Sequence, residues 1–477
     1  MILLGGLKSI SLHYWEEKET KMEKNLKEKI QKWAAIQKGD LLMDLMNLVN
    51  IPSVSDTDCK EVPFGRECQR ALKWMLDRGA DFGFTGTDYD GYAGSLSLNG
   101  EEKTNPEEVT GIWCHLDVVP AGEGWLSDPF DAVYQDGLVT GRGAQDNKAS
   151  AVMGLYLLKG LKELGITLKH PAALYFGLNE EAAMKDLDYF MGHFTPPGLS
   201  LIADCGFPAC YGEKGSMTVV FSTKKITELQ VKELQAGVAD NIIPADAAVK
   251  VVYDNKEYKL KAEGQAGHSA FPEGTKNAIP LLLQQVMKLP GLSGEALASL
   301  KPLYKLAASV NGTPAGINVQ DSEFGNLTCC AVFLKWEDGE WKLTFNLRYP
   351  HSISYETIIT KLEKYGLDNG LSLQVSHHLP SFGFSSENPV ILKLTEVYNR
   401  EAHADSKPYA MAGGTYAAKL PNAMPFGISF PDKSAIYEKF PKGHGDYHQP
   451  DESVEVDKII QALAIYLVAL VEIDETR

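Results

Sequence analysis

Hydrophobic and polar residues follow two different patterns along the chain. From about residue 80 to residue 212, short apolar runs alternate with stretches of helical periodicity. The runs "TGIWCHLDVV", "PAALYFGLNEE" and "LSLIADCGF" are typical of buried strands, and "KASAVMGLYLLKGLKELG" repeats an apolar residue at every third position before a terminal glycine, as a helix does. Alternating strands and helices predict an α/β fold with a mixed, mainly parallel sheet and helices on both faces.

After about Gly212 the pattern changes to period two. The segments "SMTVVFSTK", "AAVKVVYDN", "KEYKLKAEG", "NLTCCAVFLKW" and "WKLTFNLRYP" are typical of antiparallel strands, and helical stretches such as "AIPLLLQQVMKL" lie between them. The last ninety or so residues return to the first pattern. We therefore predict an α/β domain in two parts, residues 1–212 and 383–477, interrupted by an inserted α+β domain with an antiparallel sheet at residues 213–382.

The two ends of the chain are apolar but do not carry membrane signals. "MILLGGLKSI" has no basic region before it and no cleavage site after it, so we predict no signal peptide. We interpret residues 1–21 as a start-site artefact or a loose extension, because the helical pattern of 21–48 starts only there. "KIIQALAIYLVALVEI" is shorter than the roughly 20 residues that cross a bilayer, so it predicts a buried terminal helix at 458–473.

Charge and cysteine usage narrow the class of protein. The net charge of −17 argues against nucleic-acid and membrane partners and suits an enzyme that acts on small molecules. Seven cysteines without a CxxC pair are typical of a reducing compartment, so we expect a cytoplasmic protein.

Potential metal ligands follow three of the predicted strands. In an open α/β sheet the carboxyl ends of parallel strands meet at one edge, where ligands bind. The candidates are His115 and Asp117 after the first strand, Glu180 and Glu181 after the second, Asp204 after the third, Asp146 in "GRGAQDNK", and His448 in "GHGDYHQPDES". Each alone has an ordinary explanation, such as a core histidine, a helix N-cap or a turn residue. Together they form a ligand set for two divalent ions, and Asp117 is placed to orient the ring of His115.

Several motifs occur in a characteristic order: "HLDVVPAGEGWLSDPF", "GRGAQDNK", "GLNEEA", "IADCGFPACYGEKG" and "HQPDE", with "GVADNIIP", "GHSAFPEGTKNA" and "FNLRYP" in the insertion and "MAGGTYA" beyond it. In order and spacing they resemble those of the M20-type two-metal peptidases, the family of glutamate carboxypeptidases, aminoacylases, succinyl-diaminopimelate desuccinylases and carnosinase-type dipeptidases. The resemblance covers nearly the whole chain from about residue 40. The tryptophan-containing loop, "GEKG" and the long insertion look most like the bacterial PepV-type dipeptidases.

The resemblance implies a dinuclear site with separate tasks for the two adjacent glutamates. It makes Asp146 the bridging ligand, His115 and Asp204 the further ligands of one ion, and Glu181 and His448 those of the other, with Glu180 as the general base and Asp117 as a catalytic residue that orients His115. Neighbouring side chains on an extended backbone point in opposite directions, which lets Glu180 and Glu181 serve different parts of one site. The implied ions are zinc or manganese, with cobalt possible.

The chain departs from the family pattern in two places. Asp146-Asn147-Lys148-Ala149 stands where relatives have Asp-Asp-Lys-Gly, and we expect the cis peptide bond of the family between Asp146 and Asn147. Ala418 and Lys419 follow "GGTYA" where relatives often carry arginine, so we expect one substrate contact or ion pair there to be lost or rebuilt.

The resemblance also implies substrate-binding residues in and beside the insertion, which would act as a lid domain on the catalytic domain. They are Arg348 as a clamp on a substrate carboxylate, Asn241 and the backbone of Gly413, Gly414 and Thr415 as its helpers, and His268 as the donor to the oxyanion. Because these residues belong to two domains, we predict hinge closure near residues 212 and 383. In PepV-type relatives the extra portion of the insertion covers the surface that other family members use to dimerise, so the resemblance implies a monomer.

The resulting hypothesis is a cytoplasmic two-metal dipeptidase that removes the N-terminal residue from a small peptide substrate. Two alternatives stay open at this point. An N-acyl amino acid deacylase or desuccinylase would share the chemistry but not require a free α-amine. A catalytically silent metal-binding protein would have no use for the base Glu180.

Overall fold

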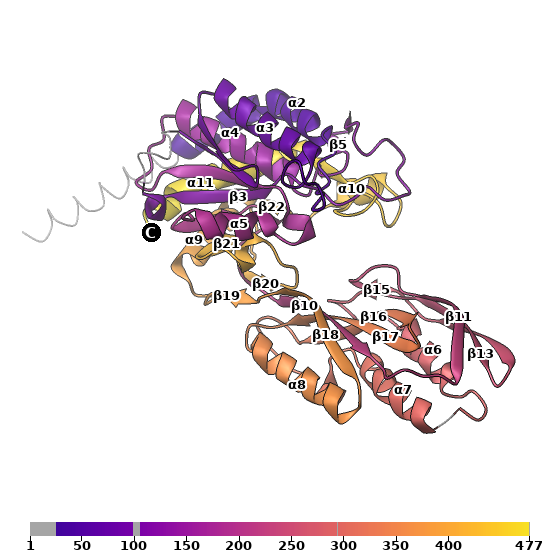
Figure 1. The fold of residues 1–477 in the computed structure, drawn as a ribbon. Coiled ribbons are helices and arrows are strands. Elements are labelled where there is room, and N and C mark those ends of the chain that lie inside the picture. Colours follow the sequence, from indigo (N-terminus) through magenta and orange to yellow (C-terminus); the bar gives the residue numbers. More distant parts are fainter. Residues whose placement is uncertain (1–24, 99–104, 293, 477) are drawn as a thin grey trace, which may run out of the picture. The chain divides into compact units, whose positions relative to one another are not determined.

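The structure is a computed structural model that describes residues 25–98, 105–292 and 294–476 (Figure 1). The predictions for residues 1–21 lie outside these residues. The chain divides into two compact units. Unit 1 contains the residues up to Tyr211, Ser385–Tyr409 and the residues from Thr415 onward, and unit 2 contains Gly212–Phe384 and Ala410–Gly414.

The segment Ala410–Gly414 corrects the sequence-based partition, which assigned every residue after 382 to the first domain. Its backbone is bound by unit 2 instead. The Lys214 N–H donates to the carbonyl of Met411, and Nη1 of Arg348 lies 3.4 Å from the carbonyl oxygen of Ala412. The chain therefore passes between the units four times, at residues 211–212, 384–385, 409–410 and 414–415.

Unit 1 is built on a six-stranded sheet in the order β1-β2-β6-β3-β7-β21. Its strands are β1 (Thr85–Tyr89), β2 (Ala93–Ser97), β3 (Thr110–His115), β6 (Ala172–Gly177), β7 (Leu199–Ile202) and β21 (Ala423–Pro425). The pairs β6–β3, β3–β7 and β7–β21 are parallel, and β1–β2 and β2–β6 are antiparallel. This confirms the predicted mixed, mainly parallel sheet.

Neighbouring residues of β6 show how helices cover both faces of this sheet. A Cβ atom added to Gly154 of α4 (Lys148–Glu163) would overlap the side chain of Leu174. The next residue, Tyr175, points the other way, stacks on Trp113 and contacts Phe190 of α5 (Lys185–His193). Helix α4 packs against β3 and β6, and against α2 (Lys38–Val49) and α11 (Val456–Asp474), so every residue from Lys148 to Leu158 is buried.

The other described elements of unit 1 are short or peripheral. Residues 25–36 are helical. The helices are α3 (Arg66–Asp81), α9 (Pro389–Ala402), α10 (Ser434–Lys439) and the 3-10 turns η2 (Pro106–Glu108), η3 (Glu180–Ala182) and η5 (Tyr416–Ala418). One small sheet joins β4 (Val133–Gln135), β5 (Leu138–Thr140) and β23 (Ser453–Glu455), and another joins β8 (Cys205–Gly206) and β22 (Ile428–Ser429).

The strands β9 (Cys210–Glu213), β19 (Phe382–Gly383) and β20 (Tyr409–Met411) form a three-stranded sheet at the positions where the chain passes between the units.

Unit 2 has an antiparallel α+β architecture, as predicted for the insertion. One sheet joins β16 (Thr328–Glu337), β17 (Glu340–Tyr349), β10 (Gly215–Ser222) and β18 (Ser372–Leu379). A second joins β11 (Leu229–Ala236), β13 (Asp246–Tyr253) and β14 (Lys256–Glu263), and a third pairs β12 (Ile242–Ile243) with β15 (Gly267–His268). Apolar side chains of the two larger sheets share one core with α6 (Ala278–Val286), α7 (Gly294–Ala307) and α8 (Tyr355–Asp368), and η4 (Thr313–Ala315) lies beside α7 and α8.

The apolar segment near the carboxyl end forms α11, and most of its side chains are buried in unit 1. This confirms the prediction of a buried terminal helix. Among the described residues, no helix has the length and apolar character needed to span a membrane.

Candidate metal-binding site

Seven residues of the predicted site lie together in unit 1. His115 is the last residue of β3, Glu180 and Glu181 follow β6, and Asp204 follows β7. Because β6, β3 and β7 are parallel neighbours, these ends meet at one edge of the sheet. Asp146 lies next to Asn147, the N-cap residue of α4, and His448 lies in the loop before β23.

The carboxylate of Asp146 lies between the two histidines. Its Oδ1 is 3.1 Å from Nε2 of His115, and its Oδ2 is 3.3 Å from Nε2 of His448. The first histidine is also 3.7 Å from Oδ2 of Asp204, and the second is 3.1 Å from Oε1 of Glu181. The five side chains therefore form two groups that share Asp146, which is the grouping expected from the sequence.

Potential ligand atoms converge within 4.8 Å of one another in two sets of described residues. One set is His115, Glu180 and Asp204, and the other is His115, Asp146 and Glu181. Imidazole nitrogens and carboxylate oxygens without a thiolate are the donors that zinc, manganese and cobalt accept. The donor chemistry of the site therefore fits divalent cations.

Asp117 contacts both the histidine and the pair of glutamates. Nδ1 of His115 donates to the Asp117 carbonyl oxygen at 2.9 Å and lies 3.4 Å from its carboxylate. This leaves Nε2 facing Asp146 and Asp204. The Asp117 carboxylate also accepts the N–H groups of Glu180 and Glu181, each at 3.1 Å. Asp117 is fully buried, and its carboxylate fixes the backbone turn that carries the two glutamates. The sequence did not predict this contact between Asp117 and the glutamate backbone.

Asn147 replaces a family aspartate and contacts the site through its amide. Its Nδ2 donates to Oδ1 of Asp204 at 2.7 Å and to the carbonyl of Ala203 at 2.9 Å, and its Oδ1 accepts the His115 N–H at 3.4 Å. The peptide bond between Asp146 and Asn147 is cis, as expected from the resemblance. The second departure from the family pattern is at Ala418 and Lys419. There Lys419 forms an ion pair of 2.7 Å with Asp188 of α5.

Burial and mutual repulsion change the pKa values of the clustered carboxyl groups. Burial raises the pKa of Glu180 well above its ordinary value, with further contributions from Asp204, Glu181 and Asp117. Burial and the nearby Asp146 raise the pKa of Asp204 to about 7. Burial would lower the pKa of His115, but the surrounding carboxylates outweigh it and raise that pKa well above its ordinary value. The cluster thus concentrates negative charge that cations neutralise.

The predicted substrate-binding residues Asn241, His268 and Arg348 belong to unit 2, and two of their segments are joined there. Ile242 pairs with His268 across β12 and β15, and the N–H of Ser269 donates to the Asn241 carbonyl at 2.8 Å. The N–H of Ala270 donates to Nδ1 of His268 at 3.1 Å, so the neutral ring carries its hydrogen on Nε2.

Arg348 lies on β17, opposite the buried side chains of Leu343, Phe345 and Leu347. Burial lowers the pKa of its guanidinium, and Nε is buried without a hydrogen-bond partner in the described structure. Gly414 also belongs to unit 2, where an added Cβ would overlap Leu379. Thr415 belongs to unit 1, is buried and caps η5, with Oγ1 accepting the Ala417 N–H at 3.2 Å.

Two further buried residues next to the cluster were missed by the sequence reasoning. Glu452 accepts the N–H of Asp146 at 2.9 Å and pairs with Arg142 at 2.6 Å. Both lie in motifs that were quoted for other residues, "HQPDE" and "GRGAQDNK". A carboxylate so close in sequence to the candidate ligand His448 was the available signal.

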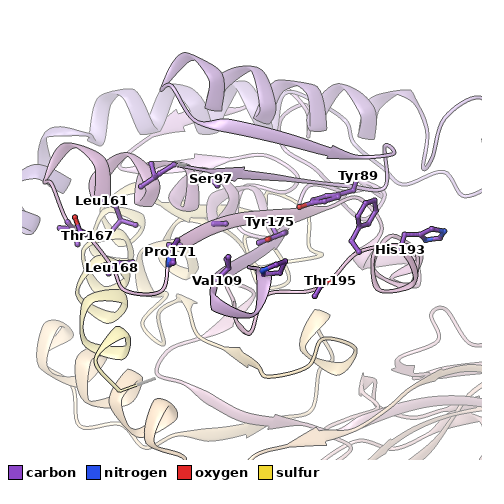
Figure 2. Close-up of a pocket in the computed structure, with 16 residues that line it drawn as sticks. Tyr89, Ser97, Val109, Leu161, Thr167, Leu168, Pro171, Tyr175, His193 and Thr195 are labelled. Atoms are coloured by element: carbon purple, nitrogen blue, oxygen red, sulfur yellow. The ribbon is translucent and has the colours of Figure 1, made fainter. Parts of the chain in front are cut away.

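A cavity in unit 1 is separate from this cluster. It has a volume of about 470 Å³ and is lined by Val109, Pro171 and Ala172 at the starts of β3 and β6, together with Tyr89, Tyr175 and others (Figure 2). Val109, Pro171 and Ala172 lie at the amino ends of the strands whose carboxyl ends carry the candidate ligands. None of the predicted site residues lines this cavity.

Comparison with known proteins shows the family of this chain. The model of peptidase family M20/M25/M40 matches residues 111–472, which is most of the chain. The chain belongs to this family. As a member of the M20/M25/M40 family it is a peptidase, an enzyme that hydrolyses peptide bonds.

The relatives agree in length with this chain. A Staphylococcus haemolyticus protein named "Putative dipeptidase" is 27% identical over an alignment of 481 residues, covering 93% of this chain and 98% of that protein. The structure of human carnosine dipeptidase 1 matches with a TM-score of 0.59 at 14% identity, covering 94% of this chain and 99% of that chain. The Bacillus subtilis YXEP protein, described as a dinuclear metal binding peptidase from the M20 family, matches with a TM-score of 0.53 at 11% identity, covering 93% and 99%. These two structures share the fold.

Proposed function

We propose that the protein is a dinuclear metal-dependent dipeptidase that releases the N-terminal amino acid of short peptides. The observation that carries the proposal is the position of Asp146, whose two carboxylate oxygens face His115 and His448 separately. A shared carboxylate between two ligand groups suits two ions, whereas one ion would need a single group. The family relatives named as dipeptidases favour this substrate class.

In this proposal the ligands divide as the family pattern implies. His115 and Asp204 would hold one ion, Glu181 and His448 the other, and Asp146 both. When bound, two such ions polarise a scissile carbonyl and acidify water, and zinc or manganese serves this chemistry, with cobalt possible.

Glu180 is the proposed general base. Its side chain belongs to the set of converging ligand atoms with His115 and Asp204, and its N–H is fixed by Asp117 at 3.1 Å. A carboxylate held there takes the proton of the attacking water and passes it to the leaving amine.

Residues of unit 2 are proposed to bind the substrate and its transition state. Nε2–H of His268 is the proposed donor to the developing oxyanion, since its Nδ1 is engaged by Ala270. The unpartnered Nε of Arg348 supports its role as the clamp on the substrate carboxylate, because a buried donor without an acceptor is unfavourable until a ligand supplies one. Asn241 and the backbone around Gly414 and Thr415 complete the proposed contacts.

The experiment compares Ala-Ala with N-acetyl-Ala as substrates of protein stripped by chelator and reloaded with zinc or manganese. We expect hydrolysis of Ala-Ala alone, restored by metal. Hydrolysis of N-acetyl-Ala alone would contradict the dipeptidase proposal and assign the same site to deacylation. Metal binding without turnover of either substrate would favour a silent metal-binding protein.

A further inference from the structure

We propose that Glu452 is a positioning residue that holds the segment of Asp146 and the segment of His448 at the separation needed for two metal ions. The inference rests on the proposed function, because it concerns the same dinuclear site. It assigns a role to a side chain that is not itself among the proposed ligands.

Glu452 binds the Asp146 segment with both carboxylate oxygens. Its Oε1 accepts the N–H groups of Gln145 and Asp146, each at 2.9 Å, and its Oε2 accepts from Nη1 of Arg142 at 2.6 Å. Three donors from one stretch of five residues therefore converge on one carboxylate. The backbone on either side of the shared ligand cannot move away from Glu452 without losing these bonds.

The other end of the connection is His448, four residues before Glu452 in the chain. The N–H of Gly445 donates to the Pro450 carbonyl at 2.8 Å, and the N–H of Ser453 donates back to Gly445 at 3.0 Å. These bonds close the loop that carries His448. The distance from Glu452 to His448 is thus set within a short, internally bonded loop, and the bonds to Asp146 transfer that constraint to the shared ligand.

A third segment is bound by the same group of residues. Nη2 of Arg142 donates to the Ala121 carbonyl at 3.1 Å, and its guanidinium stacks on the ring of Trp125. Asp451, next to Glu452, accepts the Leu126 N–H at 2.8 Å and lies 2.6 Å from Nδ1 of His444. The tryptophan-containing loop is therefore fixed to both ligand segments.

Burial makes this arrangement sensitive to small chemical changes. Glu452 is fully buried and Arg142 is 1% exposed, so water cannot replace a lost partner. A glutamine at 452 has one oxygen and one NH₂ group. If its oxygen faces the backbone N–H groups, its NH₂ faces the guanidinium, which also only donates. If it turns around, the N–H groups of Gln145 and Asp146 lose their acceptor.

Asp474 offers a matched control at the opposite end of the sheet. Its carboxylate also accepts two consecutive backbone N–H groups, those of Lys169 at 2.6 Å and His170 at 2.8 Å, and it is 7% exposed. These residues precede β6 at its amino end, so the Asp474 bonds do not constrain any proposed ligand. Asp474→Asn removes the same type of bond as Glu452→Gln.

The experiment measures the binding of manganese or zinc alone to full-length, chelator-treated protein by calorimetry, together with the visible spectrum of the cobalt-loaded form. We expect Glu452→Gln to weaken metal binding about 10- to 100-fold and to change the cobalt spectrum, as loss of a residue that orients metal ligands does. Asp474→Asn should lower the thermal midpoint of the metal-free protein but leave affinity and spectrum unchanged. Glu452→Asp, whose shorter side chain cannot reach both Arg142 and the backbone, should also weaken binding and serves if the glutamine variant does not fold.

The outcomes separate the two proposals. Equal metal affinity in wild type and the Glu452 variants would overturn the positioning role while leaving the dinuclear site in place. An equal loss of affinity in Asp474→Asn would also overturn it, because the effect would then be general destabilisation. Wild-type protein that binds neither ion would overturn the proposed function and this inference together.

Discussion

At the residue scale, Glu180 and Glu181 are neighbours with different surroundings. The backbone N–H groups of both residues donate to the carboxylate of Asp117, so their main chains are held in the same way. Their side chains differ: Glu181 contacts His448 at 3.1 Å, whereas Glu180 lies with His115 and Asp204. The surroundings of each side chain, and not its residue type, therefore distinguish the proposed ligand Glu181 from the proposed base Glu180.

This difference predicts that the same Glu→Gln substitution lowers the turnover rate at one position and the metal content at the other. Glu180→Gln should lower kcat for Ala-Ala by about 10²- to 10⁴-fold, the usual contribution of a general base, and leave the metal content near two ions per chain. Glu181→Gln should lower the metal content itself. Metal analysis and steady-state kinetics on the same preparations measure both. Turnover of Glu180→Gln within tenfold of wild type would show that the roles are wrongly assigned.

His268 carries a second prediction at this scale. Because Ala270 fixes the tautomer that leaves hydrogen on Nε2, removal of the ring should act mainly on the transition state. His268→Ala should lower kcat about 10²- to 10³-fold with a smaller change in KM, as loss of an oxyanion donor does. His377→Ala, a change at an exposed histidine of β18 in the same unit, is the control and should leave both constants near those of wild type. An effect on KM alone would contradict the role.

At the scale of elements, the sequence predicted the helices and strands whose pattern of apolar residues coincides with their pattern of buried residues. The strands that end at His115 and Gly177 and the helix α4 are continuous apolar runs because other elements cover them on both sides, and these were found. The strand β11, "LQVKELQA", was missed because most of its side chains are exposed or half-buried, so no apolar period marks it. The segment Ala410–Gly414 is bound to unit 2 by the backbone N–H of Lys214 and the side chain of Arg348, contacts that no residue pattern reports.

In the candidate site, too, some residues could be named from the sequence and others only from the structure. Histidines and carboxylates carry a chemical signal in their residue type, so all seven candidate residues could be named from the sequence, including Asp146 before α4 and His448 in a loop. The contacts of Asn147 and Glu452 were not, because amide donors and buried carboxylates occur for many structural reasons. Their partners are fixed only by folding, since Glu452 and Asp146 are far apart in sequence.

The close packing of α4 on β6 predicts contrasting effects for two glycine substitutions. Gly154→Ala should lower the free energy of unfolding by about 1–2 kcal/mol, because overpacking against Leu174 (about 1–3 kcal/mol) outweighs the gain in helix propensity of up to about 1 kcal/mol. Gly192→Ala, in α5 with open space around it, should raise the free energy of unfolding by a few tenths up to about 1 kcal/mol. Urea denaturation measures both, and stabilisation by Gly154→Ala would contradict the packing.

At the scale of the whole molecule, the clustered carboxylates couple metal binding to stability. Manganese or zinc at about 1,000 times its Kd should stabilise the folded state by about 4 kcal/mol per ion, because the unfolded chain does not hold the ligands together. The thermal midpoint of chelated protein should therefore rise on titration with metal. Asp146→Asn, which weakens the ligand shared by both groups, should largely abolish the rise. An equal rise in that variant would place the ions elsewhere.

The predicted monomer is tested by mass in solution. Small-angle scattering should give a mass near 52.4 kDa, and a stable dimer would contradict the prediction. Hinge closure stays a prediction that the same method addresses, since identical profiles with and without a tight inhibitor would count against it.

The four passages of the chain between the units also affect the order in which the protein can fold during synthesis. When the ribosome has completed Phe384, unit 2 lacks only a five-residue segment, but unit 1 still lacks β21, α11 and His448. At roughly 5–20 residues per second the missing part takes roughly 5–20 s to emerge, during which the apolar side of α4 that α11 covers is exposed. A nascent chain is thus a natural client for chaperones. The emerging chain would also lack the proposed ligand His448 until well after unit 2 has been made, so in the proposed site the ligand set is completed late in synthesis.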